Sequence, residues 1–310
     1  MESSLITSIV AATIVSGTPL VLVAMGELVT EKSGVLNLGA EGMMSVGAIA
    51  AFAAASAGAS PPLAVLAGML AGCALSLVFG LLTLTMLANQ VASGLALAIF
   101  GVGLSAFVGK PYESAPLPMV PPIRIPLLAD IPFIGPALFN HQSLVYFSWL
   151  LVAAVIWFLY RSRWGLVLRA VGESPSAAHA VGYRVIALRY AAVAFGGAMA
   201  GVGGAYMSVY YTPLWSEGMV AGRGWIALAL VVFATWRPLR VVVGAYLFGG
   251  VMISQLFVQG SGLKLEVPAQ LLSSLPYLAT IVVLVIISRN ATTIRLNSPV
   301  SLGQPYRPDA

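Results

Sequence analysis

The chain has 310 residues, of which 59% are hydrophobic and only 8% are charged, and its mean hydropathy is +0.96. A soluble domain carries roughly 25% charged residues, so this composition excludes a water-soluble globular domain and predicts an all-α, polytopic membrane protein. The net charge of +5 does not indicate a nucleic-acid partner, because the basic residues form no patch with interleaved aromatic side chains.

Apolar stretches that could cross a bilayer occur nine times along the chain. A spanning helix needs about 20 mostly apolar residues, and the seventh stretch is short enough to indicate a broken or re-entrant element. The sequence therefore predicts about nine transmembrane helices, within a range of eight to ten. The stretches are residues 5–25, 38–57, 63–87, 91–108, 144–160, 186–207, 225–236, 241–258 and 271–287.

The basic residues predict which side of the membrane each connection faces. Cytoplasmic loops are enriched in Lys and Arg, and eleven of the fifteen basic residues fall on one side of the nine-span arrangement. That side is predicted to be the cytoplasm and to hold the C-terminus, whereas nine crossings place the N-terminus outside. The eleven are Lys32, Arg161, Arg163, Arg169, Arg184, Arg189, Arg237, Arg240, Arg289, Arg295 and Arg307; the other four are Lys110, Arg124, Arg223 and Lys264.

The sequence divides into one transmembrane domain, residues 1–290, and a cytoplasmic tail, residues 291–310. The domain includes an external loop, residues 109–142, whose eight prolines exclude a long helix. This loop is either a lid or docking surface for an external partner, or a stiff connector. The tail is polar and contains proline, so we expect it to be loosely ordered.

Two segments that share Glu-Gly-Met indicate an internal repeat. Residues 38–43 lead into the second span and residues 214–219 into the seventh, and each is followed by a Gly- and Ala-rich helix. Because the two spans are five elements apart, an odd number, the copies run in opposite directions. Inverted repeats are typical of transporters whose pathway lies at the repeat interface; a chance match of three residues is the alternative.

Charged groups at the heads of these two spans have a functional and a structural interpretation. Glu41 begins the second span, where a helix N-terminus favours negative charge, and Glu217 and Arg223 at the head of the seventh could form a pair. Such groups either line the translocation pathway and its gates, or cap the ends of broken helices and hold them in place. The candidate pathway residues are Asn37, Glu41, Ser93, Glu217 and Arg223.

The motifs of enzymes and of nucleotide hydrolysis are missing from the sequence. It contains neither a Gly-x-Ser-x-Gly elbow nor a phosphate-binding Gly-x-x-x-x-Gly-Lys-Ser/Thr loop, and it has only three lysines. His141 and His179 fall on opposite sides of the membrane, and no cluster of Cys, His and carboxylates has metal-ligand spacing. We expect no catalytic activity, no metal and no cofactor in this chain.

The most polar connector, residues 161–185, is predicted to contain a short helix over residues 176–181. Ser174 is a good N-cap, Pro175 fits the first helical position and Gly182 fits the C-terminal cap. This helix is either a handle for a partner that moves the spans, or an interfacial helix that holds aromatic side chains at the lipid headgroups.

Four segments carry a resemblance to a known family: residues 31–44 at the entry to the second span, 89–97 at the turn into the fourth, 169–178 in the connector and 221–229 at the start of the seventh. They resemble permease subunits of bacterial ATP-binding-cassette (ABC) importers for ribose-type sugars, branched-chain amino acids and nucleosides. The similarity covers nearly the whole chain and is strongest to nucleoside-type permeases, which work with basic membrane lipoproteins. Relatives often carry an asparagine where this chain has Ala98, so no substrate contact is carried over to that position.

The resemblance implies a non-catalytic permease in the bacterial cytoplasmic (inner) membrane that forms half of a translocation pathway. It also implies three kinds of partner: a second, often non-identical permease, two ATP-hydrolysing subunits, and an external substrate-binding protein that is often a lipoprotein. The ATPases would dock on the connector helix and rock the repeats between outward-open and inward-open states. The residues of this coupling segment are Gly172, Glu173, Ser174, Pro175, Ala177, Ala178 and Gly182.

The resemblance makes a purine nucleoside the expected substrate, with a simple sugar as the alternative. Tyr210, Tyr211 and Trp215 could stack on a purine or act as anchors at the membrane surface. A self-sufficient secondary transporter is a further alternative, since inverted repeats occur there too, although the span centres lack the ionisable groups that ion-coupled carriers keep. A structural or assembly subunit fits poorly with so many glycine-interrupted helices.

Overall fold

The computed structural model describes residues 2–113, 115–132, 134–260, 274, 278 and 297–307. In this part of the chain, six helices are long and apolar enough to cross a membrane, and two apolar helices are shorter. Each of the first eight apolar stretches coincides with one of these helices, so the fold is that of an all-α polytopic membrane protein. The ninth stretch, residues 271–287, lies outside the described residues except for positions 274 and 278.

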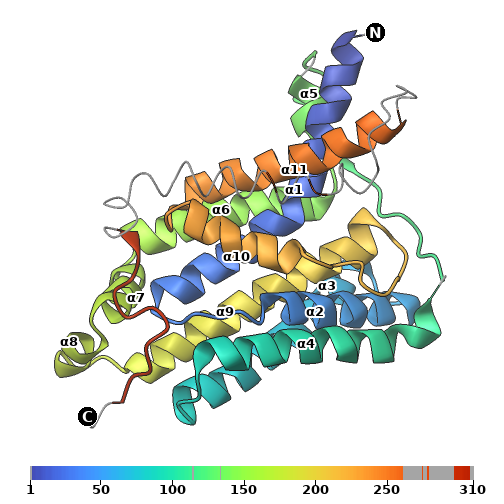
Figure 1. Ribbon diagram of the computed structural model, residues 1–310. Coiled ribbons are helices and arrows are strands. Elements are labelled where there is room, and N and C mark those ends of the chain that lie inside the picture. The colour runs from blue at the N-terminus through green and yellow to red at the C-terminus, as the bar shows by residue number, and fades with distance from the viewer. Residues whose placement is uncertain are drawn as a thin grey trace.

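The elements follow one another as shown in Figure 1. The helices are α1 Glu2–Lys32, α2 Ala40–Ser56, α3 Pro61–Gly80, α4 Gln90–Gly109, α5 Ile134–Leu138, α6 Ser143–Arg161, α7 Arg163–Glu173, α8 Pro175–Ala180, α9 Val185–Ala205, α10 Arg223–Phe233 and α11 Pro238–Gly260. π-Helical turns over Leu81–Thr85 and Tyr206–Tyr211 continue α3 and α9, and a 3-10 turn over Lys110–Tyr112 follows α4. The strands are β1 Ile123–Arg124 and β2 Asn140–His141.

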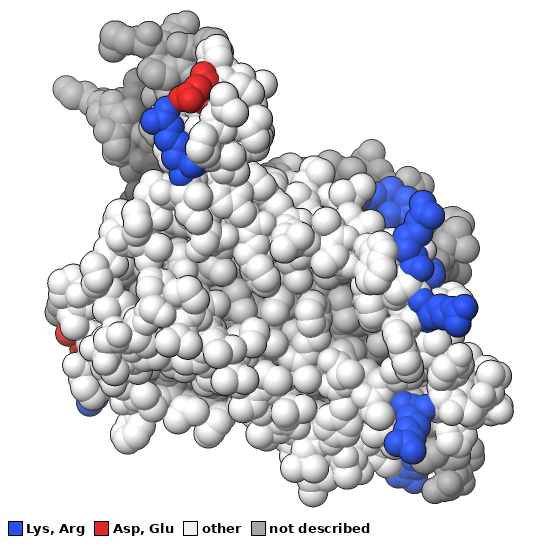
Figure 2. Space-filling model, turned by 180° about the vertical axis from the view of Figure 1, so that it is seen from behind, with Lys and Arg blue, Asp and Glu red and all other residues white. Residues whose placement is uncertain are grey.

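Basic side chains gather at one end of the described bundle, which we call the basic end (Figure 2). This end carries α7, α8, the end of α1 and residues 297–307 (Figure 1). The opposite end, called the loop end, carries residues 110–113, 115–132 and 134–142, in which β1 and β2 pair antiparallel and α5 has only five residues. The prolines there exclude a long helix as predicted. The face in Figure 2 that lies between the ends is almost free of charged side chains, as expected of a surface in contact with lipid.

Two long helices, α1 and α9, form the centre of the bundle. α1 packs against α9 and α11, and α9 packs against α2 and α3 as well. From the sequence alone, the first span ends at residue 25, but α1 continues to Lys32. This extension carries Glu27 and Glu31 into the interior, where each is no more than 1% exposed.

The helices α2 and α10 are shorter than the helices that span the bundle. At 1.5 Å per residue, the 17 residues of α2 and the 11 residues of α10 reach about 25 Å and about 16 Å, against a hydrocarbon core of about 30 Å. Gly42, near the start of α2, lies against Ala98 and Gly101, midway along the span Gln90–Tyr112. α2 therefore begins partway along the bundle as a half-helix, after the non-helical residues 34–39 that follow α1.

Glycine allows three helices to approach closely at Gly201 of α9. A Cβ atom on Gly201 would overlap the carbonyl oxygen of Gly68 in α3, and one on Gly47 of α2 would overlap the backbone of Gly201. Small residues at such contacts let membrane helices pack backbone to backbone. The high glycine content of the sequence therefore has a packing role at this point.

We expect Gly201→Val to disrupt the packing of α2, α3 and α9. Overpacking costs about 1–3 kcal/mol in well-packed cores, and the backbone atoms met here cannot yield as a flexible side chain would. Gly103→Val is the matched control, because a Cβ atom there meets nothing within 4 Å. Thermal unfolding of the two variants in detergent checks the prediction, and equal melting temperatures would contradict it.

Residues 297–307 return to the basic end and pack into it. Ser301 is 4% exposed, and its N–H and hydroxyl both donate to the carbonyl oxygen of Gly172, at 3.0 and 2.7 Å. The N–H of Gly303 donates to the carbonyl of Gly34 at 3.2 Å. The expectation of a loosely ordered tail is therefore wrong for these residues, because their polar groups find partners on distant segments that composition does not reveal.

Candidate functional site

Glu41 lies where α2 and α10 both begin, and it holds the N-terminus of α10. Its Oε1 accepts the N–H of Gly222 at 2.7 Å, and its Oε2 accepts those of Gly224 at 2.7 Å and Trp225 at 3.3 Å. The first N–H groups of a helix lack intrahelical partners, and a carboxylate also complements the positive helix end. Glu41 is only 5% exposed, so one buried carboxylate joins two half-helices. We call this contact the Glu41 junction.

The sequence around residue 222 explains how α10 approaches the carboxylate. Gly222 precedes α10 with a φ of +82°, a conformation that glycine adopts without steric cost. A Cβ atom on Gly224 would meet the backbone of Glu41. The two glycines thus give α10 both the turn and the close contact that the junction requires.

Asn37 and two carboxylates of α1 support the segments beside the junction. Asn37 Oδ1 accepts the N–H of Gly39 at 2.9 Å, and its Nδ2 donates to Glu27 Oε1 at 3.2 Å. Glu31 Oε2 accepts the indole N–H of Trp236, which follows α10, at 2.5 Å. α1 is therefore bonded to the connection before α2 and to the segment after α10.

A cavity of about 60 Å³ lies beside Glu41. Polar side chains of Ser45 in α2 and Ser105 in α4 line it together with the connection before α10. Sites for small organic ligands usually measure about 300–1,000 Å³, so this cavity has room for water but not for a solute. The described conformation therefore has no open passage for a solute beside Glu41.

Two buried aromatic side chains lie toward the loop end, and one of them, Trp215, lines this cavity. Trp215 is 3% exposed and packs on Gly109 at the end of α4 and on the ring of Phe52 in α2. Tyr210 is also 3% exposed and stacks on Tyr206, with 6.1 Å between ring centroids. The interpretation of Tyr210 and Trp215 as anchors at the membrane surface is therefore wrong, because both rings lie inside the bundle.

The structure brings together only part of the predicted pathway set. Glu41, Asn37 and Arg223 lie at or beside the junction, whereas Glu217 is exposed and Ser93 is half-buried in the first turn of α4. Arg223 does not pair with Glu217. Its Nη1 donates to the carbonyl of Met219 at 2.8 Å, and its guanidinium lies over the ring of Tyr211. The one ion pair in the described part of the chain, between Arg124 and Asp130, lies at the loop end.

The connector at the basic end contains two helices, α7 and α8. Ser174 Oγ accepts the N–H of Ala177 at 3.4 Å, Pro175 is the first residue of α8, and Gly182 has a φ of +94°. The predicted caps of α8 are therefore confirmed. α7 was not predicted; it turns apolar residues such as Val171 inward and leaves Glu173 exposed.

Arg189 of α9 joins the connector to the rest of the basic end. It is 1% exposed, and it donates to the carbonyl of Ser33 at 3.2 Å, to Ser301 Oγ at 3.0 Å and to the carbonyl of Gln304 at 3.3 Å. Ser301 in turn donates to Gly172 of α7. We call Arg189, Ser33, Gly172, Ser301 and Gln304 the Arg189 node, because four distant segments meet there at one buried guanidinium.

Comparison with known proteins agrees with this architecture. Residues 9–287 match the family described as branched-chain amino acid transport system / permease component. The chain belongs to this permease family. It is accordingly a non-catalytic, multi-pass membrane subunit of an ABC transporter, as the four motif segments implied.

The permease has curated relatives with different named solutes. It is 40% identical to a protein of Haloferax volcanii that is provisionally assigned as a glucose ABC transporter permease, over 95% of this chain and 96% of the relative. It is 34% identical to a nucleoside ABC transporter permease of Lactococcus lactis, over 89% and 90% of the two chains. It is 33% identical to a guanosine ABC transporter permease of Bacillus subtilis, over 96% of each. No solved structure matches the permease.

Sequence reasoning about the permease missed the partners of Glu41 and the whole Arg189 node. Signals for both were nevertheless present. Gly222 and Gly224 flank the first residue of α10, which indicates close approach of another group to that helix end. Arg189 lies within the first turns of an apolar span, where an arginine requires buried partners.

Proposed function

We propose that this permease forms half of the translocation pathway for a small, uncharged polar solute, with a purine nucleoside as the leading candidate. The Glu41 junction is the observation that carries the proposal. In other transporters, half-helix N-termini near the middle of the membrane attract anionic groups of the substrate. Here the carboxylate of Glu41 occupies that place. The positive helix end is therefore already neutralised, which favours an uncharged solute.

The pathway would lie between two inverted halves of a nine-span chain. Helix packing supports this arrangement: α1 packs on α11 as α9 packs on α3, and α10 lies against α1 as α2 lies against α9. If α1, α2 and α3 are equivalent to α9, α10 and α11 in an internal repeat, each packing pair in one half has its equivalent in the other. The basic end would face the cytoplasm, since cytoplasmic connections are enriched in Lys and Arg, and the C-terminus would lie there too.

The two candidate solutes are distinguished by the ATPase activity of the assembled transporter. The relatives named for nucleosides and guanosine support a purine nucleoside, and the relative named for glucose makes a simple sugar the second candidate. We expect guanosine or adenosine, together with the external binding protein, to stimulate ATP hydrolysis. Stimulation by glucose alone would overturn the nucleoside assignment. Stimulation only by charged solutes would overturn the proposal of an uncharged solute.

Coupling to ATP hydrolysis is proposed for the segment from Gly172 to Gly182. Its support is that α8 is capped at both ends, leaves Ala177 exposed, and is fastened through Gly172 to the Arg189 node. Two ATP-hydrolysing subunits would dock here, on this permease and on a second permease of the complex. An external binding protein, expected to be a lipoprotein, would deliver the solute at the loop end.

We expect Glu173→Lys or Ala177→Arg to reduce solute-stimulated ATPase activity of the assembled transporter to its basal level. Both residues are exposed beside or on α8, so a reversed or bulky charge would block docking without disturbing membrane insertion. Glu113→Lys, an exposed acidic position at the loop end, is the matched control. Normal solute-stimulated ATPase activity in both Glu173→Lys and Ala177→Arg would contradict the assignment of this segment to coupling.

A self-sufficient secondary carrier is the alternative function. Ion-coupled carriers keep ionisable groups inside their spans, and α1 does bury Glu27 and Glu31. Membership of the permease family favours the ABC subunit, because the relatives are named as ABC transporter permeases.

A further inference from the structure

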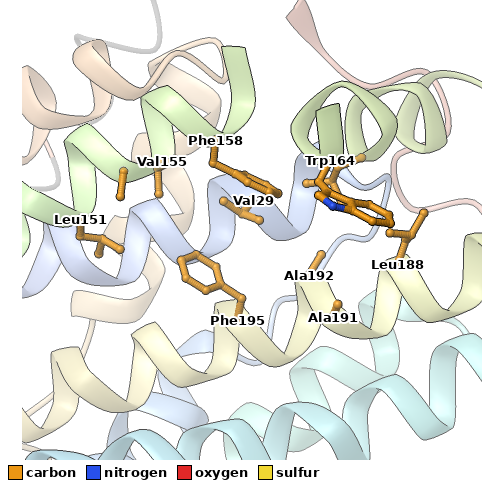
Figure 3. Close-up of a pocket in the computed structure, with 11 residues that line it drawn as sticks. Val29, Leu151, Val155, Phe158, Trp164, Leu188, Ala191, Ala192 and Phe195 are labelled. Carbon is orange, nitrogen blue, oxygen red and sulfur yellow. The ribbon is translucent and has the colours of Figure 1, made fainter. Parts of the chain in front are cut away.

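An apolar cavity of about 390 Å³ lies between α1, α6, α7 and α9 (Figure 3). Its eleven lining residues are all aliphatic or aromatic. In Figure 3, Phe158 of α6 and Phe195 of α9 lie on either side of Val29 of α1, while Trp164 of α7 and Leu188 of α9 lie together at one end. The cavity is partly open and offers no polar side chain other than the indole of Trp164.

The cavity follows two spanning helices from the basic end into the bundle. It is lined over residues 151–158 of α6 and 188–195 of α9, and seven residues of helix rise about 10 Å. Trp164 is 64% exposed, and tryptophan is enriched at the level of the lipid headgroups. The cavity therefore begins at headgroup depth and continues into the hydrocarbon region.

Arginine residues lie next to the headgroup end of the cavity. Arg161 ends α6 three residues after Phe158, a spacing that places both residues on the same helix face. Arg163 begins α7 next to Trp164, and both arginine side chains are exposed. Basic pockets between spanning helices bind the headgroups of anionic lipids.

We propose that this cavity binds one acyl chain of an anionic phospholipid whose phosphate lies between Arg161 and Arg163. An apolar cavity gives water no hydrogen-bond partners and stays dry, whereas a hydrocarbon chain matches its lining. The charge beside the mouth is complementary to a phosphate and unsuited to a neutral headgroup. The bound lipid lies beneath α7 and in direct contact with Trp164 and Leu168, which belong to the helix before the proposed coupling segment.

Fluorescence of Trp164 provides a direct test in the complete transporter, reconstituted in phosphatidylcholine vesicles. Brominated acyl chains quench tryptophan on contact, and the difference between the wild-type protein and Trp164→Phe isolates the signal of Trp164. We expect brominated phosphatidylglycerol to quench Trp164 at lower mole fraction than brominated phosphatidylcholine. Loss of either Arg161 or Arg163 to glutamine should weaken this preference about fivefold, which corresponds to about 1 kcal/mol per basic residue near an anionic surface.

A variant that fills the cavity separates this site from general contact with lipid. Ala154 lines the cavity, whereas its exposed neighbour Ala153 does not. We expect Ala154→Phe to abolish the preferential quenching and Ala153→Phe to leave it intact. Equal quenching by the two lipids, or quenching unchanged in Ala154→Phe, would overturn the proposal. So would protection of Trp164 that appears only when the second permease is present, because that subunit would then cover the cavity.

Discussion

Replacing Glu41 by alanine is expected to abolish transport and to lower the melting temperature of the permease. The change leaves the N–H groups of Gly222, Gly224 and Trp225 without their acceptor. An unsatisfied buried group costs about 1–3 kcal/mol, and whole proteins are stable by only about 5–15 kcal/mol. It also removes the negative charge that complements the start of α10, so α2 and α10 would lose their connection.

Glu41→Gln tests the role of charge apart from that of shape. The amide keeps one oxygen acceptor but turns an NH₂ group toward backbone N–H groups, so we expect an intermediate melting temperature. Transport should fall at least about tenfold, which corresponds to about 1.4 kcal/mol. Glu217→Gln is the matched control, since Glu217 stands in the other Glu-Gly-Met segment but is exposed. The measurements are uptake of labelled solute and thermal unfolding. Transport at the normal rate in Glu41→Ala would remove the junction from the pathway.

Arg189→Leu is expected to produce the second large effect, a loss of solute-stimulated ATPase activity down to the basal rate. The side chain holds the carbonyl groups of Ser33 and Gln304 and the hydroxyl of Ser301. Without these donors, the end of α1 and residues 297–307 are no longer fastened to α9. Each lost bond to a charged donor is worth about 1.5–3 kcal/mol, so the melting temperature should fall as well.

A milder variant distinguishes positioning from simple destabilisation. Ser301→Ala removes the hydroxyl that accepts from Arg189 and donates to Gly172, and Ser301→Thr retains it. We expect the ratio of stimulated to basal ATPase activity to fall in the alanine variant and to recover in the threonine variant. Ser298→Ala, at a half-buried position three residues earlier, should leave the ratio unchanged. A constant ratio in Ser301→Ala, at equal amounts of folded transporter, would show that the Arg189 node has no positioning role.

The fold was predictable where a single physical requirement governs the sequence. A bilayer demands about 20 apolar residues per crossing, and this requirement located eight of the helices from the pattern alone. The length requirement does not reveal at which depth in the membrane a helix begins. α2 is as apolar as a crossing helix, and only its contact with the middle of α4 shows that it begins halfway. Two acidic residues without nearby partners in the sequence predict the end of an apolar span, and Glu27 and Glu31 were interpreted in that way. Their buried partners, Asn37 and Trp236, lie outside α1.

In the candidate site too, local interactions were predictable from the sequence and distant ones were not. The caps of α8 depend on residues within one helical turn of each other, so Ser174, Pro175 and Gly182 sufficed to predict them. Glu41 was expected to complement the N-terminus of its own helix, but its hydrogen-bond partners lie at the start of α10, 181 to 184 residues further along the chain. The node around Arg189 depends on a serine 112 residues away. The two glycines and the buried arginine indicate that a partner exists, but no period or motif in a single sequence identifies which distant residue it is.

The position of residues 297–307 has a consequence for the order of biogenesis. Ser301 and Gln304 are synthesised more than 100 residues after Arg189 and Gly172, yet they complete the hydrogen bonds of both. A nascent chain whose helices are already in the membrane therefore still lacks a finished node. If the ATPases dock beside Gly172 as proposed, they engage a permease with a finished node in preference to one without it. Residues 297–307 would then act as a quality check on assembly.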